Sequence, residues 1–195
     1  GFTVGSASGI NTNSATFASW NWKANGSGSA NSDGSISSTV SVNTTSGFSI
    51  VTYTGNATSG ATIGHGLGVA PAVVLVKRLN STGDWVMYNK ELGAPDFMVL
   101  NSTAATASSA GIWYDTAPTS SVFSVGSDGA TNASSGTYVA YCFAEIQGFS
   151  KFGYYLGNSS NDGPFLYTGF KPAFVMIKQA TGGNANEVWR MMDGT

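Results

Sequence analysis

Few side chains in this 195-residue chain are of the types that enzymes use for chemistry. The single histidine, His65, lies in the glycine-rich stretch Gly64–Gly68, with neither a nucleophile motif nor an orienting acid beside it. The sequence therefore predicts a loop histidine rather than a catalytic base. No Lys-Ser/Thr pair follows these glycines, as a phosphate-binding loop would require, so we expect no nucleotide site.

The carboxylates occur singly along the chain. Hydrolysis of a glycosidic bond needs two carboxyl groups that face each other across the sugar, and Asp84 with Asp115 is the pair that we consider for it. Because no motif links these two residues, we expect that the protein is not an enzyme, and a glycoside hydrolase remains an alternative hypothesis. The Asp-Gly turns lack the alternating acidic ligands of a calcium loop, so we expect no metal and no cofactor.

Aromatic side chains are better candidates for binding, because a flat exposed ring can stack on a sugar face or fill a subunit contact. Trp113 and Tyr114 are predicted to lie in a strand, which would place the two rings on opposite faces, one of them exposed beside Asp115. The candidate ligand-binding residues, for a glycan or a subunit, are Trp85, Trp113, Tyr114 and Asp115. The alternative is that the rings lie in the domain core or in an interface core.

The composition limits the kind of protein that must position these residues. Only 9% of the residues are charged, against about a quarter in ordinary soluble domains, and the net charge is −2. Aromatic residues at 12% exclude a disordered chain, and abundant Ser, Thr, Asn and Gly disfavour helices. The few scattered Lys and Arg argue against nucleic-acid binding. No apolar stretch approaches the length of a transmembrane helix, so we expect no membrane insertion.

Two parts of the chain recur in sequence. Residues 1–24 align without a gap on residues 122–145, and residues from Gly47 to Lys77 align on residues from Gly148 to Lys178. The first alignment pairs Phe17, Trp20 and Trp22 with Tyr138, Tyr141 and Phe143. Internal repetition of this kind indicates a chain built from similar units.

The repeats divide the chain into four parts. Residues 1–24 match the C-terminal strands of a preceding repeat, 25–46 form a Gly/Ser/Asn-rich linker or insertion, 47–147 form a complete β-sandwich repeat, and 148–195 match the N-terminal half of a following one. Either the chain is an excerpt of a longer polypeptide, or residues 1–24 supply the strands that residues 148–195 lack, within one chain or between chains. We favour the excerpt, because the sequence ending at Thr195 has no terminal character.

Short β-rich segments separated by turn signals fill the complete unit, as in a β-sandwich or jelly roll. The expected strands are residues 48–54, 73–77, 84–88, 97–100, 112–114, 122–125 and 137–144. The run 73–77 is apolar from Val73 to Val76 and ends at Lys77, which predicts burial on both faces. The expected fold class is therefore all-β, with tandem β-sandwich (jelly-roll-like) repeats of about 100 residues.

Three strings carry a family resemblance: FSIVTYTGNATSGATIGHGLGVAPAVVLVKR, YVAYCFAEIQGFSKFGYYLGN and DGPFLYTGFKPAFVMIKQ. They closely resemble an uncharacterised repeat family in long structural proteins of marine tailed bacteriophages. The resemblance implies a structural protein of the virion, located in a tail fibre or other tail appendage, outside the cell, with a role in host attachment through surface glycans. It supplies no catalytic residues.

The expected partners follow from the resemblance, except that a head-to-tail assembly is suggested by the unmatched halves of the repeat. They are copies of the chain itself, as a trimer or a head-to-tail assembly, other virion proteins, and a host surface glycan. The alternative function is a self-assembling extracellular filament or surface-layer protein whose units are joined by strand complementation.

Overall fold

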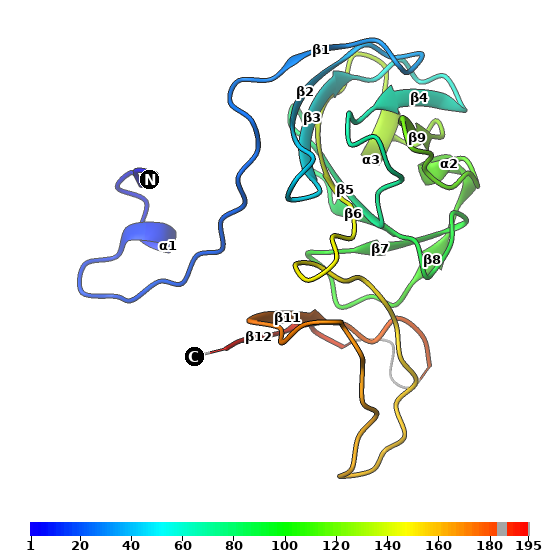
Figure 1. Ribbon diagram of the computed structural model, residues 1–195. Helices are drawn as coiled ribbons and strands as arrows, with labels where there is room; N and C mark the ends of the chain where they lie inside the picture. Colours follow the sequence, from blue (N-terminus) through cyan, green and yellow to red (C-terminus); the bar gives the residue numbers. More distant parts are fainter. Residues whose placement is uncertain (183–186, 195) are drawn as a thin grey trace.

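The computed structural model describes residues 1–182 and 187–194, and they form an all-β protein with only short helical turns. Its main element is an antiparallel sheet of eight strands in the order β1-β2-β3-β10-β5-β6-β7-β8 (Figure 1). The strands are β1 (Ser29–Asn31), β2 (Ser38–Asn43), β3 (Phe48–Thr54), β5 (Val73–Arg78), β6 (Trp85–Asn89), β7 (Asp96–Val99), β8 (Ala107–Ser108) and β10 (Thr137–Phe143).

Strand β10 lies at the centre of this sheet, although it comes last in the unit. Phe143 lies opposite both Phe48 of β3 and Val73 of β5, and Tyr138 lies opposite Tyr53 and Arg78. Strand β10 therefore joins β3 on one side to β5 on the other, although it is distant from both in sequence.

A second, two-stranded sheet covers one face of the large sheet. It consists of β4 (Ala61–Gly64) and β9 (Val122–Val125), and lies near the single helical turns α2 (Ala110–Trp113) and α3 (Gly129–Asn132) (Figure 1). The main core forms between these layers. Alternation along each strand directs one set of side chains into it, such as Val74 and Val76 of β5.

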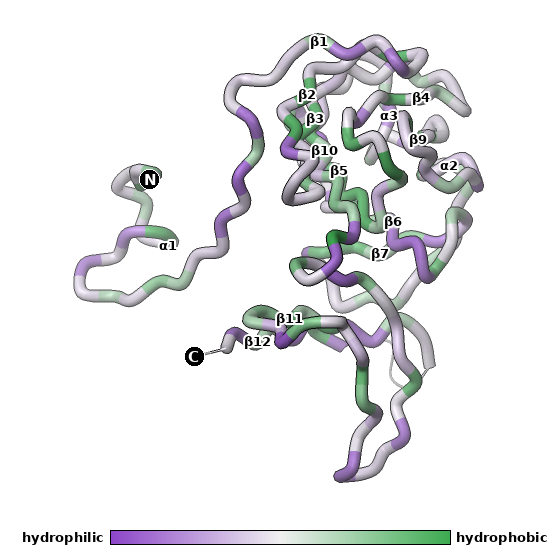
Figure 2. The backbone as a smooth tube through the Cα atoms, in the orientation of Figure 1, coloured by the Kyte–Doolittle hydropathy of each residue, from purple (hydrophilic) through white to green (hydrophobic). Residues whose placement is uncertain are grey.

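The opposite face of the large sheet carries a smaller apolar cluster. Val73, Met87 and Met98 are its buried members, and Phe152 and Trp189 from the C-terminal part of the chain pack against them. Burial of Val73 on this face and Val74 on the other confirms that the run 73–77 is buried on both sides. Hydrophobic residues accordingly follow β5 and β6 in Figure 2.

The C-terminal part contains one further pair of strands, β11 (Phe174–Ile177) and β12 (Arg190–Asp193), which form a separate two-stranded antiparallel sheet. Residues 1–24, all of which the structure describes, contain the turn α1 (Ser8–Asn11) and no strand. Figure 1 shows α1 and the chain next to it lying away from the large sheet. None of the helices in the described ranges has the length and apolar character that crossing a bilayer requires.

Two parts of the chain differ from the sequence-based picture. The strand predicted at 112–114 is wrong: Ser109 caps a helical turn through a bond from the Gly111 N–H, and Tyr114 ends it in the left-handed region with φ 55°. Residues 25–46, expected as a linker or insertion, supply β1 and β2. Strand β2 forms there because the edge of β3 offers it a hydrogen-bonding partner, with Val40 opposite Val51.

Candidate functional site

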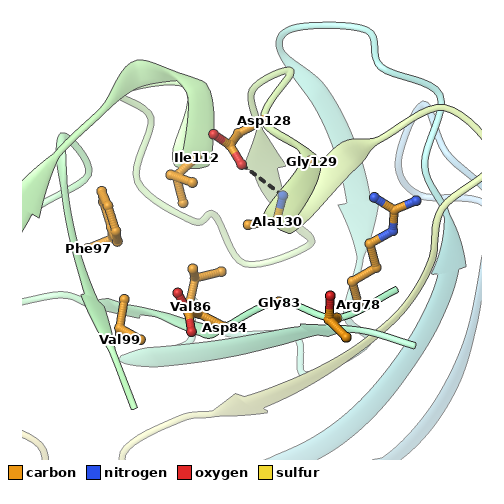
Figure 3. A pocket seen from close by; sticks show the side chains of 11 residues that line it. Arg78, Gly83, Asp84, Val86, Phe97, Val99, Ile112, Asp128, Gly129 and Ala130 are labelled. Atoms are coloured by element: carbon orange, nitrogen blue, oxygen red, sulfur yellow. Dashed lines mark hydrogen bonds between the residues drawn. The ribbon is translucent and has the colours of Figure 1, made fainter. Parts of the chain in front are cut away.

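A pocket of about 350 Å³ lies between the large sheet and the α2 and α3 turns (Figure 3). Four of its larger side chains are apolar: Val86, Phe97, Val99 and Ile112. Three are charged: Arg78, Asp84 and Asp128. Thr82, Gly83, Gly129 and Ala130 complete the lining. The pocket thus combines an apolar wall with charged hydrogen-bonding groups.

The sheet positions one side of the pocket. Val86 on β6 faces the main core, and Asp84 lies two residues before it. The Asn101 side chain holds this corner, because its amide donates to Asp84 Oδ1 over 2.9 Å and its oxygen accepts from the Trp85 N–H over 2.9 Å. The Asp84 carboxylate therefore has a defined orientation while keeping oxygen lone pairs for a ligand.

Helix capping positions the other side. Asp128 is the N-cap of α3 and accepts a hydrogen bond from the Ala130 N–H over 2.8 Å (Figure 3). Arg78, at the end of β5, donates from Nε to Asn80 Oδ1 over 3.0 Å. Figure 3 shows the Arg78 guanidinium and the Asp84 and Asp128 carboxylates around the same space. The site can therefore offer both hydrogen-bond donors and acceptors to a polar ligand.

The candidate residues chosen from sequence do not form one site. Trp85 lies on the face of β6 opposite Val86, and its ring stacks on Tyr141 with centroids 6.0 Å apart and planes 19° apart. Trp113 is buried in the main core, with 2% of its surface exposed, and meets the Tyr88 ring edge-on at 6.1 Å. These two tryptophans are therefore on opposite faces of the large sheet.

Tyr114 and Asp115 lie together on the surface, after the α2 turn. Tyr114 is 49% exposed, and its ring lies against Gly60. Asp115 is exposed and does not line the pocket that contains Asp84. The two carboxylates considered for glycoside hydrolysis are thus not brought into one pocket.

Sequence reasoning considered one pocket residue, Asp84, and missed the others, two of which are neighbours of the chosen tryptophans. Asp84 and Val86 flank Trp85, and Ile112 precedes Trp113. A period of two along β6 was a signal that Asp84 and Val86 share a face. No local signal shows that Asp128 joins them, because it comes from a distant turn.

His65 is fully buried directly after β4, and its hydrogen bonds determine its tautomer. The Leu67 N–H donates to Nδ1 over 3.2 Å, so the proton is on Nε2, which donates to the Thr119 carbonyl over 3.1 Å. Burial lowers the pKa of His65, which keeps the ring neutral. The histidine links two loops, and the sequence-based expectation of a loop histidine omitted this burial.

Two further observations bear on reactivity. Cys142 is buried, and burial raises the pKa of its thiol to about 12, which leaves it protonated and unreactive. Within the described ranges, no three His, Cys, Asp or Glu residues come together in a way that could hold a metal ion.

A second surface of interest consists of exposed apolar side chains in the C-terminal part. The most exposed of them are Phe149, Tyr154, Leu156, Phe165 and Tyr167, each more than half exposed. Exposed apolar groups gathered in one segment mark surfaces that another protein segment covers.

Comparison with known proteins yields one match. All of residues 1–195 match the family model described as "Domain of unknown function (DUF7483)". No curated protein and no solved structure matches the chain.

Proposed function

The chain belongs to the DUF7483 family, and we propose that it is a non-enzymatic structural segment of a phage tail fibre or other virion appendage that binds a host surface glycan in the pocket of Figure 3. The virion part of this proposal rests on the resemblance of the three sequence strings to repeats of phage structural proteins. The pocket is the observation that carries the binding function.

The chemistry of the pocket suits a sugar. A pyranose ring has an apolar C–H face, which can pack against Phe97, and hydroxyl groups, which can bond to Asp84 and Arg78. Burial of Val86 and Ile112 makes the wall beneath rigid. A single such site gives weak binding, and an oligomeric fibre would strengthen it by presenting several copies together.

The finer fold that we propose is a tandem array of β-sandwich units of about 100 residues. The pairing of strands supports it, because β11 and β12 have the register of β5 and β6. Phe174 lies opposite Asp193 as Val73 lies opposite Asn89.

A glycan array tests the binding function directly. The folded chain is expected to bind at least one class of glycan, and Arg78→Ala and Asp84→Asn are expected to weaken that binding by about tenfold each, as for the loss of a charged hydrogen bond. Asp115→Asn is the matched control, because this exposed carboxylate lies outside the pocket lining. Folded protein that binds no glycan, or binding that depends on Asp115 instead, contradicts the proposal.

The exposed apolar segment favours a second candidate function. In it, the chain is a self-assembling extracellular filament or surface-layer protein whose units exchange strands. Analytical ultracentrifugation of the whole chain and of a chain lacking residues 1–24 tests this. Large assemblies that dissociate on the deletion support it, and a monomer in both cases contradicts it.

A further inference from the structure

Strand β11 has an open edge where its counterpart in the complete unit is paired. β5 pairs with β6 on one side and with β10 on the other. β11 pairs with β12 in the same register as β5 with β6, and its other edge has no strand partner among the described residues. An edge strand presents unpaired N–H and C=O groups, which bind a further strand.

The sequence contains one other segment that matches β10, namely residues 16–22. The residues before it already have the local structure that precedes β10. The Asn11 side chain donates to the Gly5 carbonyl over 2.9 Å, and the Asn132 side chain donates to the Gly126 carbonyl over 2.8 Å. Each bond spans the same six-residue separation and closes the turn at the end of α1 or α3. Residues 5–15 therefore form the same turns as their counterparts 126–136 before β10.

Backbone conformation extends this correspondence. Ser14 and its counterpart Ser135 both adopt the left-handed region, with φ 64° and 58°. In the complete unit this turn leads directly into β10. The chain thus leaves the α1 turn in the direction that a strand over residues 16–22 requires.

The tryptophans of residues 16–22 are already next to β11. The ring centroid of Phe174 lies 5.5 Å from that of Trp20 and 6.5 Å from that of Trp22. In the complete unit, Phe143 is the counterpart of Trp22 and lies opposite Val73, which is the counterpart of Phe174. Trp22 and Phe174, whose rings are in contact, therefore correspond to Phe143 and Val73, which are paired between β10 and β5.

Hydrogen bonds made by the residues after Trp22 attach the C-terminal end of residues 16–22 to β2 of the same chain. The Asn43 side chain donates to the Lys23 carbonyl over 3.2 Å, and the Asn25 N–H donates to Ser41 Oγ over 2.9 Å. Trp22 also meets the rings of Phe48 and Phe143. The end of residues 16–22 is therefore fixed beside β11 of its own chain, which favours that chain over a second copy as the source of the strand.

We propose that residues 16–22 bind the open edge of β11 in the same chain as an antiparallel strand. The register places Trp22 opposite Phe174, Trp20 opposite Met176 and Ala18 opposite Lys178, as in the pairing of β10 with β5. The other edge of the new strand then pairs with residues 149–156, the counterpart of β3 with one residue inserted. This pairing covers the exposed apolar side chains of that segment and closes a second unit.

The same placement gives Asn11 a second partner. In the complete unit, Asn132 Oδ1 accepts from the Asn56 N–H over 2.9 Å. Asn158 is the counterpart of Asn56, so Asn11 Oδ1 accepts from the Asn158 N–H in the closed unit. A turn and a strand thus hold the two halves together, as they do in the complete unit.

Paired cysteines in the full chain test the register. Ser19→Cys with Ile177→Cys places two thiols opposite each other, and Ser19→Cys with Val175→Cys is the control, two residues out of register on the same face of β11. Native Cys142 is buried and does not compete. We expect the first pair to form an intrachain disulfide at least about tenfold faster than the second under mild oxidation, seen by mass spectrometry of the monomer.

Three results would overturn the proposal: no disulfide in the first pair, equal rates for both pairs, or disulfide-linked dimers. The last of these would assign the strand to a second copy. Amide hydrogen exchange is a readout without substitutions, since residues 16–22 are expected to be protected to the same degree as residues 174–177. Exchange of residues 16–22 at the rate of an unstructured chain also overturns the proposal. None of these positions lines the pocket, so the result is independent of glycan binding.

Discussion

The rings of Tyr53 and Tyr138 stack face to face across β3 and β10, with centroids 5.0 Å apart and planes 14° apart. Each hydroxyl continues the contact to the α3 turn, Tyr53 donating to the Thr131 carbonyl over 2.7 Å and Tyr138 to the Gly129 carbonyl over 2.8 Å. Gly129 lines the pocket. This pair therefore connects the centre of the large sheet to the pocket wall.

Removal of the Tyr138 hydroxyl is expected to destabilise both the centre of the large sheet and the pocket wall at Gly129. Tyr138→Phe loses the bond to Gly129 and leaves the Ala133 N–H, which donates to this hydroxyl over 2.7 Å, without its partner. The free energy of unfolding, measured in urea, should fall by about 1–3 kcal/mol. Tyr141→Phe is the control, because Tyr141 points to the other face of β10. An equal loss for both variants contradicts the role given to the Tyr138 hydroxyl.

Gly126 has no room for a side chain. A Cβ there would overlap the Gly111 carbonyl, which is backbone and unable to move aside. Gly126→Ala is therefore expected to lower the free energy of unfolding by at least about 2 kcal/mol. The counterpart Gly5 has open space around its Cβ position, so Gly5→Ala should change stability by less than about 0.5 kcal/mol. Thermal unfolding of both variants checks this, and a stable Gly126→Ala protein would show that the approach is not this close.

Buried His65 predicts a decline of stability in mild acid. Its pKa is lowered in the folded state, so the unfolded chain binds a proton more readily. The neutral buried ring therefore makes its full contribution to the free energy of unfolding above a pH of about 6.5, the ordinary pKa of histidine. That contribution is lost as the pH falls below this value. Urea unfolding between about pH 5 and 7 should show this slope, and His65→Gln should reduce it. Parallel profiles for the two proteins would be evidence against a buried neutral ring.

Trp113 and Tyr114 are adjacent in sequence and are expected to respond differently to truncation. Trp113→Ala removes a fully buried ring and should cost about 3–5 kcal/mol of unfolding free energy. Tyr114→Ala removes a half-exposed ring and should cost about 1 kcal/mol or less. Chemical denaturation measures both. Similar losses of unfolding free energy for the two variants would contradict the placement of Trp113 in the core and Tyr114 at the surface.

Cys142 should not react with thiol reagents while the protein is folded. It is buried, and its pKa of about 12 leaves almost no thiolate at pH 8. Ellman's reagent is expected to label less than about a tenth of the protein in buffer and all of it in urea. Rapid labelling in buffer would show that β10 opens readily, and would also remove the basis for using the cysteine pairs.

The sequence by itself determined the all-β class and the positions of most strands of the complete unit. Alternation and short apolar runs are local properties, so the pattern at 73–77 was sufficient to predict a strand buried on both faces. The recurrence of residues 16–22 and 137–143 was likewise visible without a structure. Such signals need no knowledge of which segments meet.

Only the tertiary structure decided which side chains share a site. The pocket brings together Asp84, Ile112 and Asp128 from three separate segments, and no local pattern encodes that meeting. The α2 turn is too short to show a helical period, so its residues matched a strand equally well. Polar β2 became a strand because β3 offered an edge to pair with. These outcomes depend on contacts between distant segments, and those contacts exist only once the chain has folded.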